Sequence, residues 1–508
     1  MAYAVEMNDI CKNFPGVRAN DHITITIEKG EIHGLLGENG SGKTTLMNVL
    51  FGLYQPDSGK IMINGQEVIM DGPRKAINLG IEMIHQHFML IKNFTVAENI
   101  ILGDEPSTRF KILNRQEISK NVSELLKQVG FQLDLNALIE DLSVGLQQRV
   151  EILKALYRKT QILILDEPTS VLTPQEADEL FVTMKKLKEQ GVTIIFISHK
   201  LREIMAICDK VTVLRRGKVI GTVRTTDTKP SELANMMVGR EVLFRLDKKE
   251  ATIGRIILKI QNLSAINERG IMAVDDVSFT VHAGEIVGIA GVQGNGQSEL
   301  IEVLTGLRRS DKGKVEIDGI SAVNLTPNEV LNRGVAHIPE DRQGRGLILT
   351  FSIMENMILG IHHNPNFTKL SIFNIDKIRT FAEDCVKNFE IKLVDLDSSI
   401  NTLSGGNQQK VILARELLGR KPKLIIAAQP THGLDVGVIE YVHKTLTQMR
   451  DQGLAILLVS TELDEIRDIT DRAFVMFEGR IMAEINPQTI SDKDVSLLMA
   501  GIKPEDEE

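Results

Sequence analysis

The glycine-rich segment Gly37–Thr44, GENGSGKT, has the residue types and spacing of a phosphate-binding P-loop, or Walker A motif. The apolar run 31–36 and the apolar-periodic stretch 44–53 flank it, which predicts a strand, the loop and a helix in that order. Backbone N–H groups of such a loop can surround phosphate oxygens. We expect Lys43 to reach the outer phosphates and the Thr44 hydroxyl to bind Mg²⁺. The predicted nucleotide contacts are Gly37, Glu38, Asn39, Gly40, Ser41, Gly42, Lys43, Thr44 and Thr45.

Two adjacent acids, Asp166 and Glu167, end the apolar run 162–165. We expect Asp166 to orient Mg²⁺ and Glu167 to polarise the attacking water, the alternative being a solvated acidic strand end. His199 ends the next apolar run, where it could contact the γ-phosphate, and Gln86 could complete the shell of metal and water. A structural histidine and a surface glutamine are the alternatives for these two residues. The predicted catalytic residues are Lys43, Gln86, Glu167 and His199, and the predicted Mg²⁺ ligands are Thr44, Gln86 and Asp166.

The chain repeats itself at a domain-sized period. Gly30 in KGEIHGLLGENGSGKTTL recurs as Gly284 in AGEIVGIAGVQGNGQSEL, 254 positions later. Gly191 in GVTIIFISHKLREI recurs as Gly453 in GLAILLVSTELDEI, 262 positions later. Buried strands alternate with helices in each copy, which predicts an α/β fold with a mostly parallel sheet. We predict a first domain at 1–240, a linker at 241–255, a second domain at 256–500 and an acidic tail at 501–508.

Composition limits the class of protein. The 508 residues carry a net charge of −9, which argues against a chain built mainly to bind nucleic acid. The 43% of apolar residues is enough to form sizeable cores. No stretch approaches 18 consecutive apolar residues, so no direct membrane insertion is expected, and the start of the chain has no signal-peptide pattern. The three cysteines are far apart in the sequence and are expected in the core rather than in disulfides or metal sites.

Four motifs together resemble the ATP-binding subunits of ABC transporters: the P-loop, LILDEPTS at 163–170, ISH at 197–199 and LSGGNQQ at 403–409. The resemblance covers nearly the whole chain and implies tandem P-loop (RecA-like) ABC ATPase domains. Each domain would have a mostly parallel core sheet, a small antiparallel β subdomain and a helical subdomain, and would use ATP and Mg²⁺. It further implies that Phe14 stacks on adenine, although a core phenylalanine remains an alternative. In this family two domains pair head to tail, with ATP between one P-loop and the other signature.

The two copies have lost different parts. At the positions of Lys43, Asp166, Glu167 and His199, the second copy has Gln297, Ala428, Gln429 and Thr461. Its signature is intact, whereas Val144 replaces a signature glycine in the first copy. We therefore predict one competent composite site, to which the second half contributes Ser404, Gly405, Gly406 and Asp435. The predicted degenerate site comprises Gly291, Gly296, Gln297, Ser298, Ser143 and Gly145. A second half that serves only as scaffold is the alternative.

The resemblance implies the motor subunit of a membrane importer, peripheral on the cytoplasmic face of the cell membrane. Its partners would be two membrane permease subunits and an extracytoplasmic solute-binding lipoprotein, with residues 88–140 touching the permease and no nucleic acid bound. IHQHFML, at 84–90, and IIAAQPTHGLDVGVIE, at 425–440, look most like the nucleoside branch. A monosaccharide importer of the ribose and galactose type is the first alternative, and a soluble tandem ABC ATPase acting on ribosomes or DNA is the second.

Overall fold

The computed structural model describes residues 3–85, 88–106, 115–129, 131, 133–158, 160–169, 172, 174–239, 248–292, 294–370, 372–499 and 501–502. The chain divides into two compact units, Met1–Val242 and Leu243–Glu508, and each is described by itself. Residues 241–247 of the predicted linker and 503–508 of the predicted acidic tail lie outside the described ranges. The boundaries of the four predicted segments stay a prediction.

The central sheet of the first unit has the strand order β10-β9-β3-β8-β7-β6. Its strands are β3 (Ile32–Leu36), β6 (Ile81–Ile84), β7 (Ile162–Asp166), β8 (Thr193–Ser198), β9 (Lys210–Arg215) and β10 (Lys218–Arg224). Neighbouring strands run parallel from β9 to β6, and β10 runs antiparallel to β9. Every residue of β3, β7 and β8 is buried, which is typical of strands covered on both faces. The predicted mostly parallel α/β sheet is confirmed.

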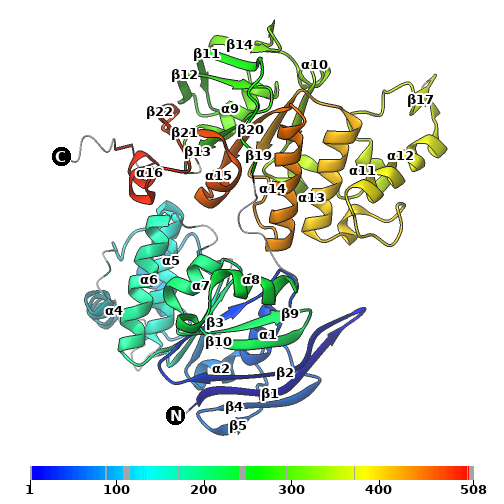
Figure 1. The fold of residues 1–508 in the computed structure, drawn as a ribbon. Coiled ribbons are helices and arrows are strands. Elements are labelled where there is room, and N and C mark those ends of the chain that lie inside the picture. The colour runs from blue at the N-terminus through cyan, green and yellow to red at the C-terminus, as the bar shows by residue number, and fades with distance from the viewer. Residues whose placement is uncertain are drawn as a thin grey trace. The chain divides into compact units, whose positions relative to one another are not determined.

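A second, antiparallel sheet of the first unit has the order β2-β1-β4-β5 (Figure 1). Its strands are β1 (Tyr3–Phe14), β2 (Val17–Glu28), β4 (Ser58–Ile63) and β5 (Gln66–Val68). One hydrophobic cluster joins Val5, Ile25 and Ile61 of this sheet to Leu46 and Leu50 of the helix that follows the P-loop. The antiparallel β subdomain implied by the resemblance is therefore present, and it packs directly on the P-loop helix.

The helices of the first unit include a separate helical subdomain. The helices are α1 (Lys43–Leu50), α2 (Pro73–Asn78), α3 (Val96–Ile101), α4 (Arg115–Val129), α5 (Val144–Tyr157), α6 (Pro174–Glu189), α7 (Leu201–Ile207) and α8 (Pro230–Val238), with short 3-10 turns at Ile139–Asp141 and Thr225–Asp227. A cluster of its own, which includes Val96, Val122 and Val150, holds α3, α4 and α5 together. Thr95 and Glu98 form a capping box at the start of α3.

The second unit repeats this plan. Its central sheet has the order β16-β19-β20-β13-β21-β22, and its antiparallel sheet has the order β12-β11-β14-β15. The strands are β11 (Ile256–Ile266), β12 (Met272–His282), β13 (Ile286–Ala290), β14 (Lys312–Ile317), β15 (Ile320–Ser321), β16 (Val335–Ile338), β19 (Leu424–Ala428), β20 (Ala455–Ser460), β21 (Arg472–Phe477) and β22 (Arg480–Ile485), and a hairpin pairs β17 (Thr368–Lys369) with β18 (Ile372–Phe373). The predicted duplication of one whole fold is confirmed.

Helices of the second unit occupy the same places along the chain as those of the first. They are α9 (Gln297–Leu304), α10 (Pro327–Asn332), α11 (Ile353–Met357), α12 (Ile375–Asn388), α13 (Gly405–Ala414), α14 (Val436–Asp451), α15 (Leu463–Ile469) and α16 (Asp492–Met499), with a 3-10 turn at Ile400–Thr402 and π-helical turns at Arg342–Gly346 and Arg415–Gly419. The three cysteines are buried and free, as predicted. Since each unit has its own core, each central sheet can position the loops at its strand ends independently.

The buried aromatic ring of Phe196, in the middle of β8, allows a test of the first unit's core. Phe196→Ala should lower the free energy of unfolding by about 3–5 kcal/mol, because it removes a fully buried ring and leaves a cavity. The matched change Val182→Ala, at an exposed position of α6, should alter it by less than about 0.5 kcal/mol. Urea unfolding followed by circular dichroism measures both, and equal effects of the two changes would contradict the assignment of the core.

Candidate nucleotide-binding and hydrolytic site

The P-loop of the first unit connects the end of β3 to the start of α1, as predicted. Lys43 is the first residue of α1, and its side chain is almost fully buried. Its Nζ donates to Gly37 O at 2.7 Å and to Glu38 O at 3.0 Å, so the ammonium lies across the mouth of the loop. This is where a lysine must be in order to meet the outer phosphates of a nucleotide that the loop surrounds.

Glycine is required in this loop because other backbone comes very close. Gly42 has φ 99°, and a side-chain carbon placed on it would lie 2.2 Å from Ala19 O. A side-chain carbon on Gly37 would lie 2.4 Å from Leu214 O and 2.5 Å from Ser41 Oγ. Among the described residues Ser41 Oγ is a buried polar atom without a hydrogen-bond partner. The loop therefore fits an anion that accepts hydrogen bonds, and a bound phosphate would satisfy this hydroxyl.

Asp166 and Thr44, the two predicted metal ligands that the structure describes, are in contact. Asp166 ends β7 and accepts a hydrogen bond from the Thr44 side chain at the start of α1. Burial is the main cause that raises the pKa of Asp166 to about 6. The nearby Glu167 carboxylate acts in the same direction, whereas the Thr44 hydrogen bond and the Lys43 charge act against it. A hydroxyl and a carboxylate side by side next to a phosphate-binding loop are the oxygen ligands that Mg²⁺ prefers. The residues present thus fit this ion.

Glu167 is held in an unusual backbone conformation directly after β7. Its φ is 47°, and its N–H donates to Ile197 O of β8 at 3.0 Å. His199 Nδ1 lies 2.9 Å from Glu167 Oε1. Burial acts to raise the pKa of Glu167, but the hydrogen bond and charge of His199, with Lys43, lower it below its ordinary value. The carboxylate is therefore ionised and oriented, as a group that polarises water has to be.

The second unit keeps this backbone and changes the chemistry. Gln429, after β19, has φ 45°, and its N–H donates to Val459 O at 2.8 Å. Its Oε1 accepts hydrogen bonds from the backbone N–H and the hydroxyl of Thr461, at 3.2 and 3.3 Å. The pair of Gln429 and Thr461 thus occupies the positions of Glu167 and His199 with uncharged groups. An amide cannot act as the base, so this strand end is unsuited to hydrolysis.

The loop of the second unit has also kept its shape and lost its charge. Gly296 has φ 94°, and a side-chain carbon on it would lie 1.9 Å from Ala273 O. Gln297 opens α9 in place of a lysine and is as deeply buried as Lys43. Among the described residues its Nε2 has no hydrogen-bond partner. A cavity of about 460 Å³ has the next residue, Ser298, in its lining, together with His337 and Ala428. Burial and nearby arginines lower the pKa of His337 to about 4, so this imidazole adds no charge at neutral pH.

Each signature motif begins a helix. Ser143 Oγ accepts from Leu146 N at the start of α5, and a side-chain carbon on Gly145 would lie 2.1 Å from Glu176 Oε1. Ser404 Oγ accepts from the backbone N–H and the side-chain amide of Asn407, at 3.4 and 3.0 Å, where Gly405 and Gly406 open α13. Exposed N–H groups at a glycine-rich helix start can bind a phosphate oxygen.

Asp435 lies at the start of α14 in the second unit. Its carbonyl accepts from Val438 N at 2.8 Å and from Ile439 N at 2.9 Å, so the loop that carries it is fixed to the helix. A side-chain carbon on Gly406 would lie 2.6 Å from Val438 Cγ2 of this helix. The start of the signature helix and the start of the helix that follows Asp435 are therefore packed against each other within one unit.

Phe14 lies at the exposed end of β1 rather than in the core. Its ring is 38% exposed and packs edge-to-face on Tyr54, with ring centroids 5.4 Å apart. The core alternative is therefore wrong, and the ring is accessible for stacking. The sequence provided no spacing signal for Tyr54, since it follows the P-loop helix in an irregular segment. Gln86 falls outside the described residues, so its predicted role is not placed by the structure.

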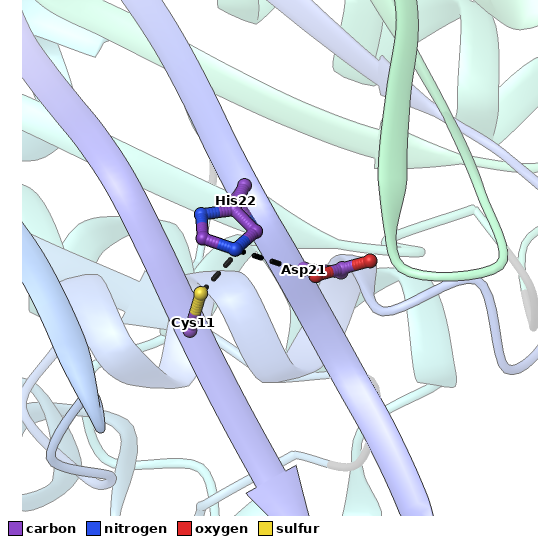
Figure 2. Close-up of side chains that lie close together, drawn as sticks. All are labelled: Cys11, Asp21 and His22. Carbon is purple, nitrogen blue, oxygen red and sulfur yellow. Dashed lines mark hydrogen bonds and ion pairs between the residues drawn. The ribbon is translucent and has the colours of Figure 1, made fainter.

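Cys11, Asp21 and His22 lie together on β1 and β2, and they are of residue types that can bind metals (Figure 2). Both oxygens of Asp21 are already paired with cations, Arg18 at 2.7 Å and Lys218 at 3.2 Å. The backbone N–H of His22 donates to Cys11 Sγ at 3.3 Å. The hydrogen bond from Lys218 and the charges of Arg18 and Lys218 lower the pKa of Asp21. This cluster is satisfied by the protein itself, and we assign no metal to it.

The model of the family described as ABC transporter matches residues 20–170 and 274–432. These two regions contain both P-loops, both acidic or formerly acidic strand ends and both signatures. The chain belongs to the ABC transporter family as an ATP-binding, ATP-hydrolysing subunit. Among the described residues, none lies in a helix long and apolar enough to cross a membrane.

Similar proteins confirm the predicted resemblance to importer ATPases. The chain is 51% identical to guanosine import ATP-binding protein NupO of Bacillus subtilis, over 99% of this chain and 98% of that one. It is 46% identical to nucleoside import ATP-binding protein NupA of Lactococcus lactis, over 98% of each chain. It is 45% identical to glucose import ATP-binding protein TsgD13 of Haloferax volcanii, over 98% of this chain and 96% of that one.

The matched strand ends of the two units provide a direct test of the site. Glu167→Gln should lower steady-state ATP turnover by about 100-fold or more while ATP binding persists, because only the base is lost. The reciprocal change, Gln429→Glu, should leave turnover within about twofold, because Gln297 and Ala428 still deprive that half of charge. Phosphate release and nucleotide-binding assays on the assembled transporter measure both. A hydrolytic gain from Gln429→Glu would show that the second unit is closer to competence than its geometry indicates.

Proposed function

We propose that this chain is the ATP-hydrolysing motor of a membrane importer that takes up nucleosides. The observation that carries the proposal is the full-length similarity to two proteins named for guanosine and nucleoside import. The chain passes its motion to other subunits, namely two membrane permease subunits supplied by an extracytoplasmic solute-binding lipoprotein. It would sit at the cytoplasmic face of the membrane.

The chain hydrolyses ATP at one composite site. The first half supplies the P-loop, Asp166, Glu167 and His199, and the second supplies Ser404, Gly405, Gly406 and Asp435 for the same nucleotide. Support comes from the distribution of the intact motifs between the halves. The first half has the complete P-loop and acid pair but a degraded signature, whereas the second half has an intact signature but a degraded P-loop and strand end. Independent decay of two sites would not produce this pattern.

Each residue of the first half has a definite task in this reaction. The P-loop N–H groups and the Lys43 ammonium bind the phosphates and offset the charge that develops on them. Glu167 accepts a hydrogen bond from and orients the attacking water, and His199 keeps the carboxylate in place. Thr44 and Asp166, with Gln86, would hold Mg²⁺, which supplies additional positive charge to the phosphates when bound. Phe14 would stack on the adenine ring.

The degenerate site of the second half binds nucleotide weakly or statically, if at all. The loop of Gly291 and Gly296 and the hydroxyl of Ser298 are retained, and the signature of the first half retains Ser143 and Gly145. The neutral Gln297 cannot replace an ammonium, and Ala428 cannot hold a cation. The second half therefore contributes mainly as the folded domain that carries the intact signature.

A monosaccharide importer is the second candidate, and one observation favours it. The glucose importer protein of Haloferax volcanii is 45% identical, almost the same as the nucleoside importer protein of Lactococcus lactis. Since the ATPase does not itself touch the solute, its residues carry little information about the transported molecule.

Uptake of radiolabelled solute decides between these candidates. Cells that express the chain with its permease should accumulate guanosine or another nucleoside, and unlabelled ribose or glucose in excess should not compete. Cells with Glu167→Gln should lose the uptake, since binding without hydrolysis cannot drive transport. Competition by a monosaccharide, with none by nucleosides, would replace nucleoside import by the sugar alternative.

Matched changes at the two signature serines test the composite site. Ser404→Arg should abolish ATP turnover, whereas Ser143→Arg should leave most of it, because the signature of the second half serves the competent site. Both serines cap a helix, so each change costs a similar ~1 kcal/mol of local stability. Phosphate release by the chain assembled with its permease is the measurement. Equal loss in both variants, or loss only in Ser143→Arg, would contradict the division of labour between the halves.

A further inference from the structure

The segment that follows β16, an edge strand of the second unit's central sheet, is longer in sequence than the segment that follows β6 in the first unit. Ile91 N donates to Asn99 Oδ1 at 2.8 Å, and Ile348 N donates to Asn356 Oδ1 at 2.9 Å, so these residues correspond. From Gln86 to Ile91 the chain advances five positions, and from the corresponding Glu340 to Ile348 it advances eight. The second unit therefore carries three additional residues in the segment Asp341–Gly346, which we name the inserted turn.

The inserted turn is a rigid element. Asp341 Oδ1 accepts from Gln343 N at 3.1 Å and from Gly344 N at 2.8 Å. The backbone carbonyl of Asp341 accepts from Arg345 N and Gly346 N, which closes a π-helical turn. At the other end Gly346 O accepts from the buried Arg415 at 3.0 Å. The side chains of the inserted turn consequently leave a fixed backbone.

Two of these side chains contact the elements that form the signature region of the second unit. Arg342 Nη1 donates to His432 O at 2.9 Å, in the loop that leads to Asp435. Gln343 Nε2 donates to Gln408 Oε1 at 3.2 Å, on the signature helix α13. The turn is thereby fastened both to the signature helix and to the loop of Asp435.

The guanidinium of Arg342 lies at the junction of these two elements. A side-chain carbon placed on Gly405 would be 3.4 Å from Arg342 Nη2, and one on Gly433 would be 3.7 Å away. The carboxylates of Asp341 and Asp435 both act electrostatically on this guanidinium. One fixed cation thus borders the first residue of the signature helix, the turn at Gly433 and the charge of Asp435.

We infer that Arg342 is a positioning residue for ATP hydrolysis, which holds the start of the signature helix and the Asp435 loop in the relative geometry that the nucleotide requires. The inference rests on the proposed composite site, in which both elements serve the ATP of the first half. At the corresponding place the first unit has the shorter segment 87–89, HFM, without an arginine, and its own signature is the degraded one. Arg342 is thus present in the unit that has the intact signature.

Arg345 provides a control from the same turn. Its Nη1 donates to Glu302 Oε1 at 2.8 Å on α9, and its side chain is 59% exposed. It has the same charge and size as Arg342, but it contacts the helix of the degenerate loop rather than the signature region.

The test compares Arg342→Ala, Arg342→Lys and Arg345→Gln in the chain assembled with its permease. Arg342→Ala should lower kcat for ATP by about tenfold to 100-fold, as a misplaced contact does, with KM within about twofold because the P-loop is intact. Arg342→Lys should recover only part of the rate, since an ammonium lacks the planar fork of the guanidinium. Added guanidine should restore part of the turnover of Arg342→Ala. Arg345→Gln should behave as the unmodified chain.

Ser404→Arg, measured in parallel, separates the two levels of the proposal. If Ser404→Arg abolishes turnover and Arg342→Ala does not lower kcat, the positioning role is overturned and the composite site stands. If Ser404→Arg leaves turnover intact, the composite site itself fails. If Arg342→Ala lowers the thermal transition together with the rate, and neither guanidine nor Arg342→Lys restores turnover, Arg342 only stabilises the fold and the inference is also overturned.

Discussion

The close approach of loop backbone to neighbouring strands is the constraint on which each nucleotide loop depends. Gly42 in the first unit and Gly296 in the second press against Ala19 O and Ala273 O, leaving no room for a side chain. This approach starts the following helix at a defined point and thereby places Lys43 over the loop and Thr44 against Asp166. The charges of the site can act on phosphate only because the backbone beneath them is held so closely.

The second unit keeps the backbone geometry of the site although the charged side chains are absent from it. Gln429 keeps the left-handed backbone of Glu167, and Thr461 keeps the contact that His199 makes. Gln297 is as buried as Lys43, although burying an amide without a partner costs free energy. The same strand end leads directly into the loop that carries His432 and Asp435. One segment can therefore combine a strand end that lacks the acid pair with the loop that carries Asp435.

Asymmetry between the units follows from the same division. The first unit concentrates its charged groups at the ends of β3, β7 and β8, where phosphate would be bound and water polarised. The second unit instead concentrates polar contacts around the start of α13, with Arg342 and Gln343 fastening the signature region to the inserted turn. One half thus carries the charged groups of the predicted hydrolytic site, and the other carries the polar contacts that hold its signature region.

The sequence by itself determined the duplication, the α/β class, the P-loop, the acid pair with His199 and the loss of charge in the second half. These features are local, since glycine spacing and apolar runs of strand length encode them directly. Only the tertiary structure decided that Phe14 is exposed beside Tyr54, that Gln429 and Thr461 reproduce the contact of Glu167 and His199, and that Arg342 reaches His432. Arg342 and His432 are 90 positions apart. Such contacts depend on how strands and helices from distant parts of the chain pack, and no local pattern of residue types records that packing.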